Sequence, residues 1–523
     1  MSETTAPRSR REIYLAMSGL MIAMLLAMLD NMIIGTAMPT IVGELGGLAH
    51  LSWVVTAYAL AATASTPLWG KFGDLYGRKG IFMSSIVIFL LGSALSGAAQ
   101  DMGQLIGFRA VQGLGAGGLM VGAMAIIADL VPPRERARYQ GMMAAVMPLA
   151  FIGGPLLGGF FTDNLSWRWS FYINIPLGII ALAVCAVTLH LPRHRVKHTI
   201  DYAGAALLTL ASVSLVLVTA WGGSEYEWAS PQVIGLIAAS VVSIVGFVLV
   251  ERRAVEPILP LSLFANRNFT LAAVLGFVAG FAMFAAVSYL PLYQQSVQGA
   301  SATNSGLLLM PMMLAAMVVS MVTGNLITRT GRYRIFPILG GIGLSAGMFL
   351  FTQLDVDTSR FTSSLFMVVL GLGLGFLMQT TMVIAQNSVE AKNNGVASST
   401  ATYFRSIGGS MGVSLLGALF IAVLSSSLTS SLGAAGAELT SGSGTLTPAA
   451  LDQLPAPVHA AYLQAVVDAM QSMFLAGAVV AVVAVVAAWF IREVPLRSAP
   501  VTEAENAAPP APAAAVSAVG AES

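Results

Sequence analysis

Two charged residues, Asp30 and Arg109, lie within long apolar segments, where they could perform proton chemistry. An ionisable side chain inside a membrane is costly, so each is a candidate functional group. Burial disfavours the charged form of a carboxyl group, which would let Asp30 bind and release a proton. At about 1.5 Å of helix per residue, both residues are expected in the outer half of a membrane. We predict that Arg109 tunes Asp30 in proton coupling; a static ion pair is the alternative.

A second set of polar and aromatic residues interrupts other apolar segments. Gln379 and Gln386 are spaced to share one face of a helix. Arg405 lies near the middle of its segment, where contact with a substrate and packing against helix carbonyl groups are both open alternatives. The 27 methionines suit apolar pockets of broad selectivity. The residues predicted to line a substrate cavity are Tyr58, Phe284, Tyr289, Tyr293, Gln379, Gln386 and Arg405.

The composition indicates a membrane protein. Hydrophobic residues make up 56% of the 523 positions and charged residues 9%, whereas a soluble domain carries about 25% charged residues. The net charge of +1 predicts no nucleic-acid partner, and the single cysteine, Cys185, excludes an intramolecular disulfide. No G-x-x-x-x-G-K-[ST] motif is present to bind ATP. We expect a protein that is not an enzyme and needs neither cofactor nor metal.

Fourteen apolar runs are long enough to cross a membrane. A spanning helix needs about 20 mostly apolar residues. Backbone groups in lipid must bond internally, which restricts such runs to helices or barrel strands, and this length selects helices. The predicted spans are 13–35, 52–69, 81–99, 104–128, 140–162, 171–191, 203–221, 231–250, 270–293, 306–327, 335–352, 362–387, 396–424 and 466–491.

Lysine and arginine residues predict the orientation of these spans. With the N-terminus inside, 21 of the 25 fall in inner loops or tails. Arg168 and Arg360 fall in outer loops, and Arg109 and Arg405 fall within spans. This asymmetry follows the positive-inside rule for an even number of spans. We predict a multi-pass protein of the bacterial cell (inner) membrane with both termini in the cytoplasm.

A repeated loop divides the chain into halves. Residues 70–79, after the second span, and residues 324–332, after the tenth, both read G-x6-G-R. Repeated halves are typical of transporters that alternate between inward- and outward-open states. The predicted parts are a cytoplasmic N-terminus (1–12), a six-helix half (13–191), a two-helix insertion with flanking cytoplasmic loops (192–268), a second six-helix half (269–491) with a long outer loop (425–465), and a disordered cytoplasmic tail (492–523).

Five motifs resemble those of one transporter family. Residues 70–79 are similar to the cytoplasmic-loop signature of the major facilitator superfamily. Residues 105–113 resemble its fourth-span motif with a buried arginine, and residues 154–159 resemble the fifth-span motif of its exporters. Residues 29–34 and 167–176 resemble motifs of its fourteen-helix drug:proton antiporters.

This resemblance implies an all-α major-facilitator fold of two six-helix halves plus two central helices. It also implies a cytoplasmic gate of charges that forms in one access state and breaks in the other, with ordinary solvation of these loop charges as the alternative. For the fifth-span glycines it implies a hinge or seal, although helix packing alone would require the same residues. The gate residues are Gly70, Asp74, Gly77, Arg78, Asp129, Gly331 and Arg332, and the fifth-span residues are Gly154, Pro155, Gly158 and Gly159.

The function that these features predict is proton-coupled export of amphipathic drugs or antibiotics by alternating access. The expected partners are small amphipathic molecules, protons and membrane lipid, and we expect a monomer. A dedicated exporter of one natural product is an open alternative. A nutrient importer of the same fold is disfavoured by Asp30 and by the Gly154-Pro155 pair.

Overall fold

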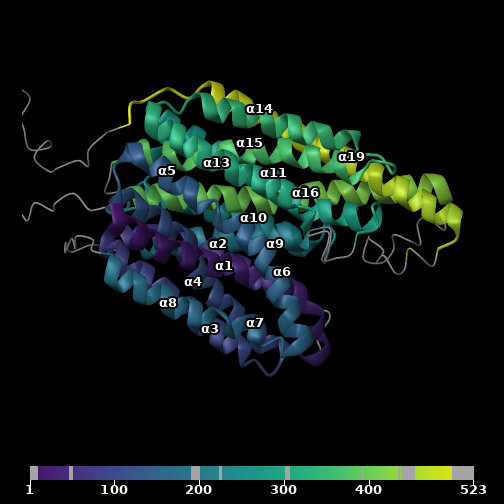
Figure 1. Ribbon diagram of the computed structural model, residues 1–523, viewed down its shortest axis with the longest axis horizontal. Helices are drawn as coiled ribbons and strands as arrows, with labels where there is room; N and C mark the ends of the chain where they lie inside the picture. The colour runs from purple at the N-terminus through teal and green to yellow at the C-terminus, as the bar shows by residue number, and fades with distance from the viewer. Residues whose placement is uncertain are drawn as a thin grey trace, which may run out of the picture.

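The computed structural model describes residues 10–45, 51–189, 201–222, 226–300, 307–390, 393–433, 436, 451 and 454–496. Within these residues the protein is built almost wholly of helices (Figure 1). The helices are α1 (Arg10–Leu45), α2 (Leu51–Tyr76), α3 (Arg78–Gly97), α4 (Met102–Leu130), α5 (Pro133–Met143), α6 (Val146–Asn164), α7 (Trp169–Tyr172), α8 (Asn174–Thr188), α9 (Tyr202–Trp221), α10 (Pro231–Glu251), α11 (Arg267–Ser296), α13 (Met310–Thr330), α14 (Ile335–Leu350), α15 (Arg360–Asn387), α16 (Asn394–Leu432) and α19 (Ala456–Trp489), with short 3-10 turns at Leu261–Ala265 and Phe351–Gln353.

Thirteen helical segments in the described part of the chain are long and apolar enough to cross a membrane. They match thirteen of the fourteen predicted spans, with α5 and α6 forming one and α7 and α8 another. The fourteenth predicted span, 52–69, corresponds to α2, a 26-residue helix whose last turns carry Lys71 and Asp74. It packs against α4 and α16, so protein contacts replace lipid along much of its surface and a less apolar sequence is sufficient. The all-α fold of fourteen membrane helices is therefore confirmed.

Two helical halves enclose the centre of the molecule. In the first, α2 and α3 pack on α4, and α1 packs on α6 and α8. In the second, α11 packs on α16, and α13 and α14 pack on α15. Figure 1 shows the first half below the second, closest together at the left and diverging to the right. The pair α9 and α10 lies between them, with α9 in contact with both α2 and α16.

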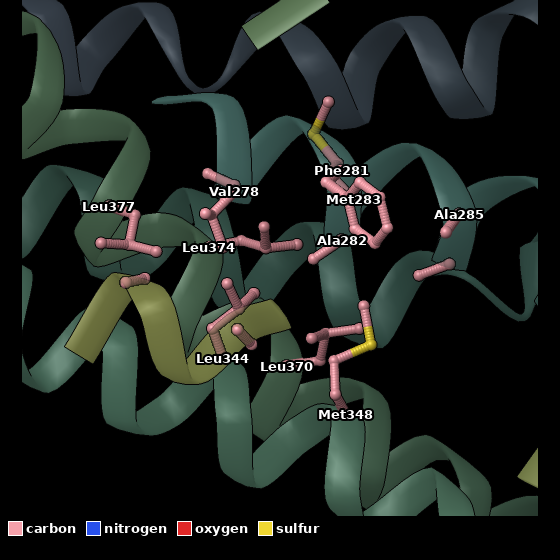
Figure 2. Packing of buried hydrophobic residues seen from close by; sticks show 14 of the residues in the cluster. Val278, Phe281, Ala282, Met283, Ala285, Leu344, Met348, Leu370, Leu374 and Leu377 are labelled. Carbon is pink, nitrogen blue, oxygen red and sulfur yellow. The ribbon is translucent and has the colours of Figure 1, made fainter. Parts of the chain in front are cut away.

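Each half has its own apolar core, which allows it to move as a unit. Figure 2 shows side chains of this core in the second half, among them Leu344 and Met348 of α14 and Leu370 and Leu377 of α15. All four side chains are fully buried. Close packing of this kind resists deformation, so conformational change concentrates at contacts between the halves.

The second glycine of each G-x6-G-R loop adopts a backbone conformation that few other residues can adopt. Gly77 lies between α2 and α3 with φ 98°, and Gly331 ends α13 with φ 70°. A residue with a Cβ rarely adopts this left-handed conformation, so glycine permits both sharp turns.

Several predicted segments fall partly or wholly outside the described residues. These include 1–9 of the N-terminus, 190–191 of the first half, 192–200 of the insertion and 497–523 of the tail. In the predicted outer loop 425–465, α16 continues to Leu432 and α19 begins at Ala456, so both helices extend into this segment. The rest of that loop, apart from residues 433, 436, 451, 454 and 455, is also outside the described part.

Candidate functional site

Asp30 of α1 and Arg109 of α4 form an ion pair in the interior of the first half. Arg109 Nη1 lies 2.5 Å from Asp30 Oδ2, and both side chains have 0% exposure. The pair joins residues that are 79 positions apart in the sequence. A buried charge is tolerated when it is paired and hydrogen-bonded, so each of these two groups is stabilised by the other.

Two amide side chains complete the surroundings of the Asp30 carboxylate. Gln112 Nε2 donates to Asp30 Oδ1 at 2.8 Å, and Asn174 Nδ2 donates to the same oxygen at 2.7 Å. Gln112 also accepts from Arg109 Nη1 at 2.8 Å. Both carboxylate oxygens thus accept hydrogen bonds from N–H donors, an arrangement that matches the ionised form of an aspartate.

Tyr58 of α2 supports the guanidinium of this pair. Its ring centroid lies 4.1 Å from Arg109 Cζ, a distance suited to a cation–π contact. Its hydroxyl donates to the Ala27 carbonyl at 3.4 Å, and Arg109 Nε donates to the Val54 carbonyl at 3.3 Å. Tyr58, which was predicted to line the substrate cavity, lies beside Arg109.

The sequence prediction missed Gln112 and Asn174. Gln112 follows Arg109 by three residues, which places both side chains on one face of α4. Asn174 lies at the start of α8, inside the motif 167–176, and also donates to Ser93 Oγ at 2.9 Å. An uncharged amide in an apolar span was the available signal for both residues.

The fifth-span motif packs against the helix that carries Asp30. Gly154 of α6 lies against Met32 of α1, and a side chain at Gly154 would collide with it. The carbonyl groups of Gly158 and Gly159 accept from Thr162 Oγ1 at 2.9 and 3.0 Å. The side chain of Pro155 is outside the described part of the structure. Movement of α6 against α1 would therefore act close to the ion pair.

The three predicted gate charges of the first half lie together at the predicted cytoplasmic end. Arg78 Nη2 lies 2.7 Å from Asp74 Oδ1, and Arg78 Nη1 pairs with Asp129. Arg78 Nη1 also donates to the Ala125 carbonyl at 2.9 Å. The arginine thereby links the end of α2 to the end of α4.

Asp74 also links the first half to the second. Its two carboxylate oxygens accept from the backbone N–H groups of Gly395 at 3.0 Å and Val396 at 2.8 Å. These groups belong to the first turn of α16, where the helix dipole favours a negative charge. Gly70, one helical turn before Asp74, lies against Gly395 and Ser399 with no space for a side chain. The acidic side chain therefore caps a helix of the opposite half.

Asp74→Asn is expected to weaken closure of the predicted cytoplasmic end. A hydrogen bond to a charged group contributes about 1.5–3 kcal/mol, so the ratio of closed to open molecules should fall about 10- to 100-fold. Spin labels on Gly80→Cys and Arg332→Cys would report this as a shift of the distance distribution to larger values. Both sites can carry a label, because a side chain at Gly80 meets open space and Arg332 is exposed. The native Cys185 is buried and should not compete for the label.

The matched control for this prediction is Glu44→Gln. Glu44 pairs with Arg168 at 3.1 Å near the other end of the first half, so the variant removes the same charge away from α16. Equal distance distributions for Asp74→Asn and the parent would contradict the capping role.

A second contact between the halves involves α5 and α13. Arg134 donates to the carbonyl groups of Thr328 at 3.0 Å and Arg329 at 2.9 Å. Gly324 lies against the backbone of Ala137, so α5 and α13 approach closely. Arg332, a predicted gate residue, is exposed, and none of the ion pairs between described residues includes it. The sequence analysis missed Arg134, because many other lysine and arginine residues also lie in the predicted inner loops.

Gln379 and Gln386 of α15 connect the halves as well. Gln379 Nε2 donates to the Ala137 carbonyl at 2.5 Å. Gln386 Nε2 donates to the Met124 carbonyl at 3.2 Å, and Gln386 Oε1 accepts from Gln140 Nε2 at 2.9 Å. The predicted polar stripe of α15 thus faces the other half.

A methionine-rich cavity lies between the two halves. Ten of its sixteen lining residues are methionines. They come from α1, α4 and the α5–α6 region of the first half and from α13 and α15 of the second. Gln379 and Arg405, two of the residues predicted to line a substrate cavity, are among its lining residues. Flexible thioether side chains adapt to ligands of different shape.

The other predicted cavity residues lie elsewhere in the second half. Tyr289 donates its hydroxyl to the Val413 carbonyl at 3.0 Å, and the buried Tyr293 donates to the Asp355 carbonyl at 2.8 Å. Phe284 lies against Gly409 of α16 and is 41% exposed. These contacts hold α11 to α16 and to the loop before α15.

A family model matches the part of the chain that carries the five sequence motifs. The model of the Major Facilitator Superfamily matches residues 20–413, well over half of the chain. The chain belongs to the major facilitator superfamily. It is therefore a transporter, as members of this family are, and its fold and family are not those of an enzyme.

Relatives within the superfamily include transporters of drugs. The chain is 41% identical over 495 residues to an uncharacterised MFS-type transporter of Mycobacterium tuberculosis, covering 94% of this chain and 71% of the relative. It is 41% identical over 420 residues to the multidrug transporter protein MdtP of Bacillus subtilis, covering 80% and 77%. The solved structure of the proton:xylose symporter XylE is similar in fold alone, with a TM-score of 0.58, 14% identity and coverage of 93% and 97%.

Proposed function

We propose that this superfamily member is a proton-coupled antiporter that exports amphipathic small molecules across the bacterial cell (inner) membrane, acting as a monomer with both termini in the cytoplasm. Export of drugs is supported by the likeness to MdtP, whose name describes a multidrug transporter. Proton coupling is supported by the buried carboxylate of Asp30. Alternating access is supported by the two packed halves with a cavity between them.

The observation that carries this proposal is that the same two helices build the ion pair and the cavity. Helix α1 supplies Asp30 to the pair and Met28, two residues earlier, to the cavity wall. Helix α4 supplies Arg109 to the pair and Met120 to the wall. A change in the charge of Asp30 would alter the forces on α1 and α4, and the cavity would respond because it shares these helices.

We assign this conformation to a stage of the proposed cycle in which the cytoplasmic end is closed. The contacts of Asp74 with α16 and of Arg134 with α13 close the predicted cytoplasmic end. At this stage the ionised Asp30 is held by Arg109, Gln112 and Asn174. Proton binding would remove the attraction of Arg109 for the carboxylate and so favour rearrangement of α1 against α4.

Transport in inverted membrane vesicles tests this function. The lumen of such vesicles corresponds to the outside of the cell, so an acidic lumen should drive an amphipathic dye inward. We expect dye accumulation that collapses when a protonophore removes the gradient. Dye movement that is independent of the gradient would contradict antiport, and proton-driven movement out of the vesicles would indicate an importer. Natural products tested alongside the dye would identify a dedicated exporter by its single substrate.

A further inference from the structure

We propose that the methionine-rich cavity selects amphipathic molecules that carry an acidic group, with Arg405 as the residue that binds this group. The ligand class is a small apolar body with one carboxylate or sulfonate. This inference rests on the proposed export function, because it assigns a substrate class to the cavity of the same transporter.

The guanidinium of Arg405 is largely unused by the protein. Arg405 lies in α16, where its backbone packs against Gly280 of α11, and its side chain extends to α4 of the opposite half. Its hydrogen bond within the described residues runs from Nη2 to Met120 Sδ at 3.0 Å. A thioether is a weak acceptor, whereas a guanidinium carries five N–H donors. Most of the donor capacity of Arg405 is therefore available to a ligand in the cavity.

In the part of the chain that the structure describes, no acidic side chain pairs with Arg405. None of the sixteen lining residues is acidic, and the ion pairs between described residues do not include Arg405. Arg109, the other arginine within a span, illustrates the contrast because a carboxylate and an amide carbonyl partner it. A cation held in an apolar site without a partner is costly, and a bound anion would offset that cost.

The side chains of the cavity suit a ligand with an apolar body and one acidic group. A planar guanidinium binds a carboxylate or sulfonate through two parallel hydrogen bonds, which an ammonium ion cannot imitate. The methionine side chains supply an adaptable apolar surface for the body of the ligand. Gln140, also in the cavity wall, has a buried Oε1 without a hydrogen-bond partner among the described residues and could accept from a donor on the ligand. A cationic head group would instead be repelled by Arg405.

Three fluorescent probes with one apolar body separate the effect of charge from that of hydrophobicity. They are pyrenebutyrate, its neutral carboxamide, and the corresponding pyrenebutyl trimethylammonium cation. In equilibrium binding to the full-length protein in detergent, affinity should be highest for pyrenebutyrate, lower for the carboxamide and lowest for the cation. Since a charge-assisted hydrogen bond changes affinity about 10- to 100-fold, we expect pyrenebutyrate to bind tighter than the carboxamide by that factor.

Variants at Arg405 test which residue sets this order. Arg405→Gln should lower affinity for pyrenebutyrate about 10- to 100-fold, leave the carboxamide within about threefold, and improve binding of the cation. Arg405→Lys keeps the charge without the planar fork and should give an intermediate affinity. Arg360→Gln, the same substitution at an exposed arginine that does not line the cavity, is the matched control and should preserve the order. Size-exclusion profiles and melting temperatures check that each variant is folded.

The outcomes distinguish this inference from the proposed function. Equal binding of the three probes by the parent protein, tighter binding of the cation, or an unchanged order in folded Arg405→Gln would overturn the assignment of Arg405. The parent ranking decides the matter if that variant does not fold. Binding needs no proton gradient, so loss of gradient-driven transport for every probe would reject the antiport function while the binding order still tests Arg405.

Discussion

Asp30→Asn should reduce gradient-driven dye accumulation in inverted vesicles to the level of protein-free vesicles. The variant keeps the size of the side chain and one carbonyl acceptor but removes the group that would exchange a proton. Exchange of labelled for unlabelled substrate at equal pH requires no net proton movement, so it should be retained more than gradient-driven accumulation. The comparison of the two fluxes measures the loss of coupling.

Two further variants control for damage to the fold. Asp468→Asn removes a carboxylate from α19, where Asp468 accepts from Ser427 Oγ at 2.9 Å and Gln464 Nε2 at 3.0 Å, and it should transport like the parent. Asp30→Glu keeps a titratable carboxyl group and should retain part of the gradient dependence. Full gradient-driven transport by Asp30→Asn would reject Asp30 as the proton carrier.

Arg109→Ala should destabilise the protein by about 3–5 kcal/mol, because it leaves the carboxylate of Asp30 buried without its counter-charge. The hydrogen bonds from Gln112 and Asn174 remain, but neither amide carries a charge. The cation–π contact with Tyr58 is lost as well. Thermal unfolding of the purified variant in detergent measures this effect as a lowered melting temperature.

The double variant Asp30→Asn with Arg109→Gln separates the static role of the pair from its role in coupling. It removes both charges together, which is far less costly than removing one. We expect its melting temperature to recover toward that of the parent while gradient-driven transport stays absent. Recovery of both stability and transport would mean that the pair is only structural.

The ion pair itself could be predicted because charge is rare in apolar spans. Asp30 and Arg109 stand out against their neighbours, and the orientation from lysine and arginine positions places them at similar depth. Gln112 and Asn174 carry no charge, and the sequence does not indicate that α4 and α8 turn them toward the same oxygen. Their role depends on helix rotation and packing, which the hydropathy of a span does not specify.

The contacts between the halves were less accessible to sequence reasoning. Asp74 was predicted as a gate residue, but its partners are backbone N–H groups of α16, which have no sequence signature. The polarity of Gln379 suggested that it lines a cavity, which it does, but its hydrogen bond to the Ala137 carbonyl of the other half could not be predicted. The aromatic candidates Tyr58, Tyr289 and Tyr293 were selected by residue type, and packing directs them elsewhere.

The sequence by itself determined the all-α membrane fold, the number of helices, the repeat and the positions of the membrane-embedded charges. These properties depend on hydropathy, charge and glycine, which act locally along the chain. Only the tertiary structure decided that Asp74 caps a helix of the opposite half, that methionines from both halves form one cavity, and that Arg405 faces it without an acidic partner among the described residues. Those facts arise from contacts between helices hundreds of residues apart, and such contacts depend on the rotation and approach of packed helices rather than on any single segment.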